Sequence, residues 1–121
     1  MVSFEAFRAV DGTPVYLQII NFIKRGAIAG TIRDGDELPS RRVLSALLGI
    51  NPNTVQKAFH ILEEEHLMES RTGAKSCMTL PPDTLDALRR EVLSDELRAM
   101  ARTLRQLGIS KEEALRLIEQ A

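Results

Sequence analysis

Apolar residues recur at helical spacing over most of the chain. The first such stretch predicts a helix that begins at Thr13 and Pro14 and ends near Gly30. Threonine is a good N-cap, and proline is favoured at the first helical position. The apolar positions follow one another in steps of four, three and four, which places them in one buried stripe: Tyr16, Ile20, Ile23 and Ala27. The residues before Thr13 are too mixed in character to predict one element: Phe4, Phe7 and Val10 could cover a core edge or form a short strand.

Two further helices follow and are joined by a very short turn. Ser40 is a good N-cap for the first, and Gly49 can adopt the left-handed conformation that ends it. Asn51 and Pro52 signal the start of the second, which we place at about 52–65. The positions expected to be buried are Val43, Leu44, Leu47 and Leu48 in the first helix and Val55, Ala58, Phe59 and Leu62 in the second. Two short helices joined through a glycine-containing turn form the helix-turn-helix motif, whose second helix reaches base edges in the DNA major groove.

After these helices the pattern changes to short alternating segments, which predict a two-stranded hairpin. Its strands are expected at 67–71 and 76–80, with the tip near Gly73. A hairpin directly behind a helix-turn-helix makes the winged variant of the motif. We therefore predict a mainly α fold with a small β-hairpin.

Pro81 and Pro82 interrupt the chain after the hairpin. They separate a winged helix-turn-helix domain at 1–80 from a helical tail at 81–121. A long helix in the tail carries a heptad-like apolar seam, in which steps of four and three alternate: Leu93, Leu97, Met100, Leu104 and Leu107.

A last short helix follows Gly108, with Ser110 as its N-cap and Glu113 completing a capping box. Its residues expected to be buried are Ala114, Leu115 or Leu117, and Ile118. Two helices cannot make an independent core, so the tail must pack on the first domain or on a second copy of the chain. We expect self-association, which makes the seam a dimerisation surface; packing within one chain is the alternative.

Charge is distributed unevenly along the 121 residues, although the net charge is only -1. The segment 38–62 contains three cations and no acid, and the segment 70–80 contains two cations and no acid. These cations are Arg41, Arg42 and Lys57 in the first segment and Arg71 and Lys75 in the second. A positive face on a near-neutral chain is therefore expected, with chance segregation in a short sequence as the alternative.

The composition also bears on where the protein works. No apolar run approaches the roughly 20 residues that span a bilayer. The first residues include Glu5, Arg8 and Asp11, unlike a signal peptide. A single cysteine, Cys77, excludes an intramolecular disulfide and fits a reducing compartment. We expect a cytoplasmic protein without a membrane partner.

Catalytic chemistry is not indicated by any motif. The sequence lacks a nucleophile with its base, a metal-binding cluster and a phosphate-cradling glycine loop. We therefore expect neither an enzyme nor a cofactor. His60 and His66 lie six residues apart, which does not place them on one helical face for a shared metal site. His60 lies either at a phosphate edge or half-buried, and His66 is expected to end its helix and pack on the hairpin. Cys77 is expected in a strand, with a redox-sensing thiol as the alternative.

With these motifs in place, residues 13–80 resemble the DNA-binding domain of the GntR family of bacterial regulators. The specific part of the resemblance is LPSRRVLSALLGINPNTVQKA. The two-helix tail, together with PVYLQI in the first helix, is similar to the YtrA-type subfamily, whose small members lack a large effector domain and dimerise through the tail. The resemblance implies a homodimer that binds palindromic half-sites of a double-stranded DNA operator. It further implies repression of the protein's own operon or a neighbouring transporter operon.

The resemblance also implies site residues. Arg42 matches the arginine with which the family contacts DNA, and Gly73 matches the wing-tip glycine that enters the minor groove. The other matched positions lie in the turn and at the start of the following helix: Asn51, Pro52, Asn53, Thr54 and Gln56. Pro52 stands where a base-reading arginine is common in the family, so base reading falls to Asn53, Gln56 and Lys57. Asparagine and glutamine can pair with adenine through two hydrogen bonds.

The remaining cations are assigned from their positions. Lys57 is expected to contact phosphate more than bases, because a flexible point charge positions a protein better than it specifies a base. Arg71 and Lys75 flank the wing tip and are expected to contact phosphate. For Arg41 both a DNA contact and a plain surface position stay open. A winged-helix protein-interaction module without DNA binding is the alternative function, and no effector site is visible.

Overall fold

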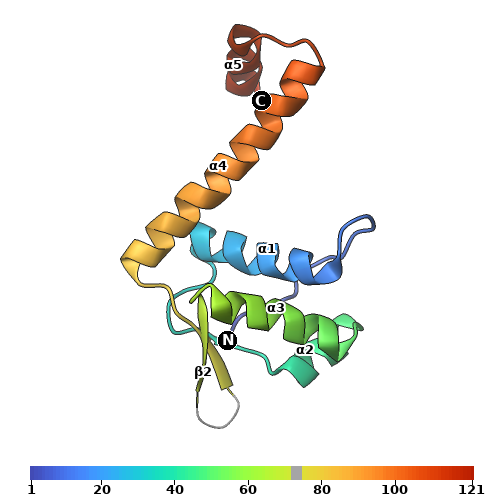
Figure 1. Cartoon of the computed structure of the whole chain (residues 1–121), viewed down its shortest axis with the longest axis vertical. Coiled ribbons are helices and arrows are strands. Elements are labelled where there is room, and N and C mark those ends of the chain that lie inside the picture. Colours follow the sequence, from blue (N-terminus) through green and yellow to red (C-terminus); the bar gives the residue numbers. More distant parts are fainter. Residues whose placement is uncertain (72–74) are drawn as a thin grey trace. The chain divides into compact units, whose positions relative to one another are not determined.

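The computed structural model describes residues 1–71 and 75–121, and it divides into two units, Met1–Asp86 and Ala87–Ala121. The described elements are α1 (Val15–Ala29), β1 (Glu37–Leu38), α2 (Arg41–Leu48), α3 (Pro52–Glu64), β2 (Met68–Arg71), β3 (Lys75–Met78), α4 (Pro82–Gln106) and α5 (Lys111–Gln120) (Figure 1). The predicted mainly helical class with a small sheet is confirmed. None of the described helices is both long and apolar enough to cross a membrane.

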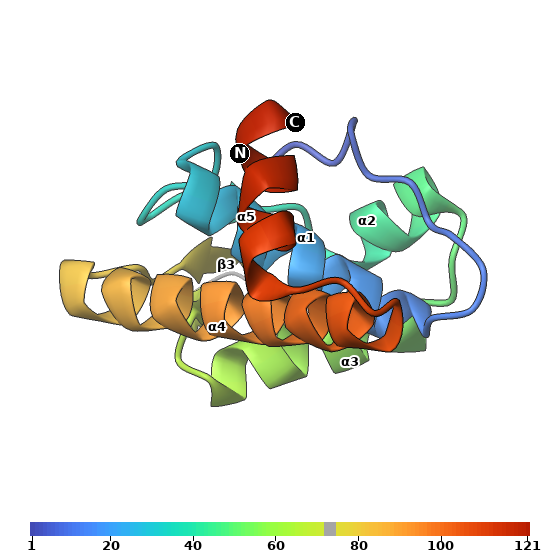
Figure 2. The ribbon, with the colours of Figure 1, turned by 90° about the horizontal axis from the view of Figure 1, so that it is seen from above.

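The core of the first unit is organised around α3, which packs against both α1 and α2. Figures 1 and 2 show α1 running alongside α3 in two perpendicular views. The largest fully buried side chains include Phe59, Leu62 and Val55 of α3, Ile19 and Ile23 of α1, and Leu44 of α2. The helical periodicity of α3 therefore predicted its buried face. That of α1 predicted Ile20, Ile23 and Ala27, which are buried, but missed Ile19.

The sheet has three antiparallel strands in the order β1-β3-β2. The predicted hairpin is present, with Met68 opposite Met78 and Arg71 opposite Lys75. The strand β1, which the sequence pattern did not predict, pairs Leu38 with Ser76 on the other side of β3. A strand of two residues is too short to show an alternating pattern, so only its pairing with β3 identifies it.

Two predictions about helix ends and faces are wrong. Pro14, not Thr13, is the N-cap of α1, and no side chain caps this helix. The carbonyl of Thr13 instead accepts a hydrogen bond of 2.8 Å from Gln18 Nε2. In α2 the predicted burial of Val43 and Leu47 fails, since they are 47% and 69% exposed. The physical reason is that α2 buries the face that carries Leu44 and the polar Ser45, and Val43 and Leu47 lie to one side of that face.

The N-terminal segment is held on α1 by one glutamine and a group of aromatic rings. Gln18 Oε1 accepts from the Val10 amide at 2.8 Å, and Gln18 Nε2 donates to the Val10 carbonyl at 2.9 Å. The ring centroids of Phe4 and Phe7 lie 5.2 and 5.5 Å from that of Phe22 on α1. These are typical distances for favourable aromatic pairs.

In the second unit, α5 begins as predicted, because Ser110 Oγ accepts a hydrogen bond of 3.2 Å from the Glu113 amide. Ala114 is buried, also as predicted. The predicted burial of the larger apolar residues of α5 is not met within a single chain: Leu115, Leu117 and Ile118 are all exposed.

The connection between α3 and β2 turns at His66, whose φ of 61° is the only positive value among the described non-glycine residues. The expectation that His66 packs on the hairpin is wrong, because its side chain is exposed. The helix has already ended at Glu64, and the His66 amide donates to the Glu63 carbonyl at 3.0 Å. This position therefore needs the backbone conformation of a glycine and does not use the histidine ring.

We predict that His66→Gly raises the free energy of unfolding by up to about 1 kcal/mol. Glycine has no Cβ penalty in the left-handed region, and its greater backbone entropy in the unfolded chain offsets part of the gain. The measurement is urea denaturation of the full chain. The matched control is His60→Gly inside α3, which should lower stability by roughly 0.5 kcal/mol. A His66→Gly variant no more stable than the parent would contradict the prediction.

Candidate nucleic-acid interface

The turn between α2 and α3 is fixed by a serine that the sequence pattern did not single out. Ser45 Oγ donates a hydrogen bond of 2.6 Å to the Ile50 carbonyl, and the Ile50 amide donates back to the Ser45 carbonyl at 3.1 Å. Gly49 lies between them with a φ of 65°, as a left-handed helix end requires. These contacts set how closely α3 follows α2, and therefore the direction in which α3 presents its outer face.

Both helices of the motif begin at the predicted caps. Ser40 Oγ accepts from the Val43 amide at 3.1 Å, and Asn51 Oδ1 accepts from the Asn53 amide at 2.8 Å. Pro52 occupies the first turn of α3, where its missing N–H leaves no donor unpaired. The oxygen of the Asn51 side chain is therefore engaged in folding the helix, and Pro52 has no polar side-chain atom with which to read a base.

The outer face of α3 is polar and the inner face is apolar. Val55, Ala58, Phe59 and Leu62 on the inner face are fully buried. On the outer face the exposed side chains are Asn53, Gln56, Lys57 and His60, which we call the recognition face. At 100° per residue, Asn53, Lys57 and His60 fall in one row, while Gln56 lies toward α2. Thr54 is half-buried at the edge of this face. Of the two alternatives left for His60, the half-buried one is wrong, because its side chain is exposed.

The three acidic residues at the end of α3 each lie close to a basic side chain. Glu63, Glu64 and Glu65 lie 2.9, 3.0 and 3.0 Å from nitrogens of Arg41, His60 and Lys24, respectively. The Glu63 carboxylate also accepts a hydrogen bond of 3.1 Å from Ser70 Oγ on β2. Glu63 therefore joins α2, α3 and β2, and the charges of Glu63 and Glu65 are each paired with a cation.

The two adjacent arginines at the start of α2 have different surroundings. The Arg41 guanidinium bonds to Glu63 and lies 5.4 Å from the ring centroid of Phe59, with its side chain only 30% exposed. Arg42 is exposed and forms no hydrogen bond or ion pair with any part of the chain that the structure describes. The structure gives Arg41 a role within the fold, whereas the charge of Arg42 is available to a ligand.

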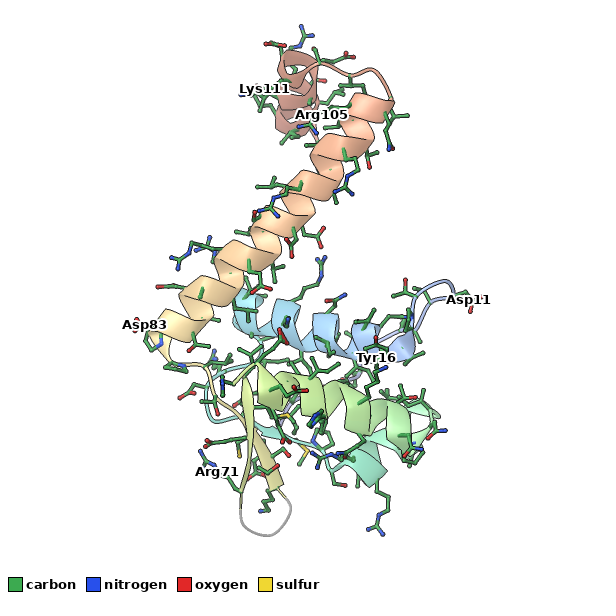
Figure 3. All side chains as sticks on the ribbon, in the orientation of Figure 1. Asp11, Tyr16, Arg71, Asp83, Arg105 and Lys111 are labelled. Atoms are coloured by element: carbon green, nitrogen blue, oxygen red, sulfur yellow. The ribbon has the colours of Figure 1, made fainter. Side chains whose placement is uncertain are left out.

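The hairpin presents two more cations. Arg71 and Lys75 face each other across β2 and β3, and both side chains are more than half exposed; Figure 3 labels Arg71 on the hairpin. Their acidic neighbours are Glu69 at 3.4 Å and Glu37 at 4.0 Å. Such exposed pairs contribute little free energy, so both cations can exchange a carboxylate for a phosphate. Gly73, predicted at the wing tip, lies outside the described residues.

Lys57 has an aromatic neighbour that sequence reasoning missed. Its Nζ lies 4.0 Å from the ring centroid of Tyr16, at the start of α1. Tyr16 had been expected in the buried stripe of α1, and it is in fact half-buried. The two residues are 41 positions apart in the sequence, so only the packing of α1 on α3 brings them together.

Two linked helices with a polar outer face, followed by a small antiparallel hairpin, define a winged helix-turn-helix protein. The family model of bacterial regulatory proteins of the gntR family matches residues 15–75, which is half of the chain. The chain therefore belongs to the GntR family of transcriptional regulators, whose helix-turn-helix binds DNA.

Relatives and solved structures agree with this membership. The chain is 29% identical over 102 residues to YhcF, an uncharacterized HTH-type transcriptional regulator of Bacillus subtilis, covering 84% of each chain. It is 43% identical over 63 residues to the HTH-type transcriptional repressor YtrA of the same organism, covering 52% of this chain and 48% of that relative. A GntR family regulator from Listeria monocytogenes superposes with a TM-score of 0.85 at 27% identity, over 93% of this chain and 99% of its own.

The different surroundings of the two arginines lead to a prediction about stability. Arg41→Ala should lower the free energy of unfolding by roughly 1 kcal/mol, because it removes both the Glu63 ion pair and the packing on Phe59. Arg42→Ala should change stability by less than about 0.5 kcal/mol, as is usual for an exposed position. Thermal or urea unfolding of the two variants measures this difference. An equal decrease in the free energy of unfolding in both variants would show that the contacts of Arg41 with Glu63 and Phe59 do not stabilise the fold.

Proposed function

We propose that this chain is a homodimeric repressor that binds a palindromic DNA operator, acting on its own operon or on a neighbouring transporter operon. In this proposal α3 enters the major groove and the wing tip near Gly73 enters the minor groove. The observation that carries the proposal is the recognition face, where polar, exposed side chains lie directly opposite a fully buried apolar face. The helix can therefore present this face to a ligand without disturbing the core.

The chemistry of the exposed residues divides the proposed contacts into two kinds. Asn53 and Gln56 carry amides, which can pair with adenine through two hydrogen bonds, and they are the proposed base readers. Arg42, Arg71 and Lys75 are exposed cations on neighbouring elements and are proposed to bind phosphates. Contacts from α2 and from the hairpin would hold α3 at a defined depth in the groove.

The proposed dimer rests on the apolar residues of the tail. Leu97 and Leu107 are 63% and 68% exposed in the single chain, and Leu93 and Met100 are also exposed. Leu104 in the same row is half-buried. Exposing a row of apolar side chains to water along one helix costs free energy. The same seam on a second copy of the chain would cover these side chains. Repression is supported by the relative YtrA of Bacillus subtilis, which is named a transcriptional repressor.

The DNA contacts can be tested by fluorescence anisotropy on the DNA upstream of the protein's own gene, measured at several salt concentrations. Arg42→Ala should weaken binding to all sequences and reduce the salt slope by about 0.9, which corresponds to one phosphate contact. Gln56→Ala should cost roughly 1–3 kcal/mol on the specific site and leave binding to scrambled DNA unchanged.

Arg102→Ala is the matched control for these variants, since it removes one exposed cation from α4. It should leave both affinity and salt slope unchanged. Binding by Arg42→Ala that equals binding by the parent would refute the proposed role of α2. A parent protein whose binding neither prefers a sequence nor weakens with salt would refute operator binding itself.

The dimer can be tested by sedimentation equilibrium. Leu97→Glu combined with Leu104→Glu should give a monomer with reduced operator affinity, because two charges in the seam would be buried without partners. Ala99→Glu adds a charge to the opposite face of α4 and should leave the dimer intact. A double variant that still sediments as a dimer would place the interface elsewhere.

A further inference from the structure

The contact between Tyr16 and Lys57 joins the recognition helix to a helix outside the helix-turn-helix. The distance of 4.0 Å from Lys57 Nζ to the ring centroid is well within the range of about 6 Å for a cation–π interaction. Lys57 is exposed and forms no ion pair with any carboxylate of the described chain. Figure 3 labels Tyr16 at the N-terminal end of α1, the helix that runs alongside α3. The aromatic ring is therefore the partner that the folded chain provides for this charge.

The contact leaves hydrogen-bond donors of both residues available. An ammonium group has three N–H donors, and a ring beneath it covers only one side. The Tyr16 hydroxyl is also a donor, and it forms no hydrogen bond with the residues that the structure describes. A ring that restricts the flexible lysine before binding also reduces the side-chain entropy that the lysine loses on contact. Two donors held close together on a half-exposed surface are suited to a phosphate oxygen.

The position of the pair on α3 agrees with such a ligand. Gln56 and Glu63 lie on the side of α3 that faces α2, and Lys57 lies on the side that faces α1. A helix in the major groove has a phosphate backbone along each edge of the groove. In the proposed complex, Arg42 on α2 would contact one backbone, and the pair of Tyr16 and Lys57 would contact the other.

We propose that Tyr16 and Lys57 together form a phosphate clamp that binds the DNA backbone on the α1 side of the recognition face. The clamp rests on the proposed operator binding and adds α1 to the DNA-contacting elements. Tyr16 both positions the lysine through its ring and donates its own hydroxyl. Because phosphates carry no sequence information, the clamp contributes affinity without base preference.

The test is a set of anisotropy titrations with the full-length chain on two duplexes, the DNA upstream of the protein's own gene and a scrambled version. Lys57→Gln should lose about fivefold in affinity on both duplexes and reduce the salt slope by about 0.9. Tyr16→Leu should lose about fivefold and Tyr16→Phe about twofold, because phenylalanine keeps the ring and loses the hydroxyl. Lys111→Gln on α5 removes another exposed lysine and should change nothing.

A double-mutant comparison separates a clamp from two independent contacts. In the Lys57→Gln background, Tyr16→Leu should lose clearly less affinity than in the parent, because the ring no longer has a cation to hold. Equal losses in both backgrounds, or an unchanged salt slope in Lys57→Gln, would overturn the clamp. Tyr16→Phe preserves the packing of the ring, so its DNA affinity is the measurement to use if Tyr16→Leu does not fold. If Tyr16→Phe binds DNA as tightly as the parent, the proposed contact of the Tyr16 hydroxyl with phosphate is wrong.

The outcomes also distinguish the clamp from the function on which it rests. If the parent and Arg42→Ala behave as proposed while the Tyr16 and Lys57 variants bind like the parent, the clamp alone is wrong. If the parent shows no salt-dependent binding to either duplex, both the proposed operator binding and the clamp are wrong.

Discussion

The burial of one face of α3 is the constraint on which the rest of the structure depends. Val55, Ala58, Phe59 and Leu62 are all fully buried against the neighbouring elements. Because a helix has 3.6 residues per turn, burying these four positions determines which side chains face outward. The same packing brings Arg41 and Glu63 together on one flank and Lys57 and Tyr16 together on the other. The core and the proposed interface are therefore opposite faces of one helix.

The charges around α3 show how a chain with a net charge of -1 can leave exposed cations without an acidic partner beside the recognition face. The acids that follow the recognition face are each close to a basic side chain, and Glu63 also ties the motif to the hairpin through Ser70. Arg42 and Lys57 have no carboxylate partner among the described residues. Internal pairing thus determines which cations have no carboxylate partner. A count of charges along the sequence cannot show this.

The helices and the hairpin could be predicted because their signals are local. The caps at Ser40, Asn51 and Ser110 each lie within three residues of the amide they accept from. The sequence also indicated the inner face of α3, since a helix of this length shows its period clearly. Val43 and Leu47 were mispredicted because the buried face of α2 includes the polar Ser45, which gives no apolar signal for that face.

The contacts that refine the candidate site join residues far apart in the sequence, and local patterns carry no information about them. The pairing of Arg41 with Glu63 spans 22 positions, and the two strands β1 and β3 meet only in the folded sheet. The resemblance to a family placed Arg42 and Gln56 in the site, whereas Tyr16 became visible only through its distance to Lys57. These residue pairs could therefore be identified only from the packing of the folded chain, and not from sequence motifs.

The central claim is that the outer face of α3, supported by α2 and the hairpin, meets DNA. The most direct test is an NMR titration of the ¹⁵N-labelled full-length chain with a duplex from upstream of its own gene. We expect the largest chemical-shift changes at Asn53, Gln56 and Lys57, with further changes at Arg42 and at the strands of the hairpin. Changes confined to α4 and α5, with the spectrum of α3 unaltered, would contradict it.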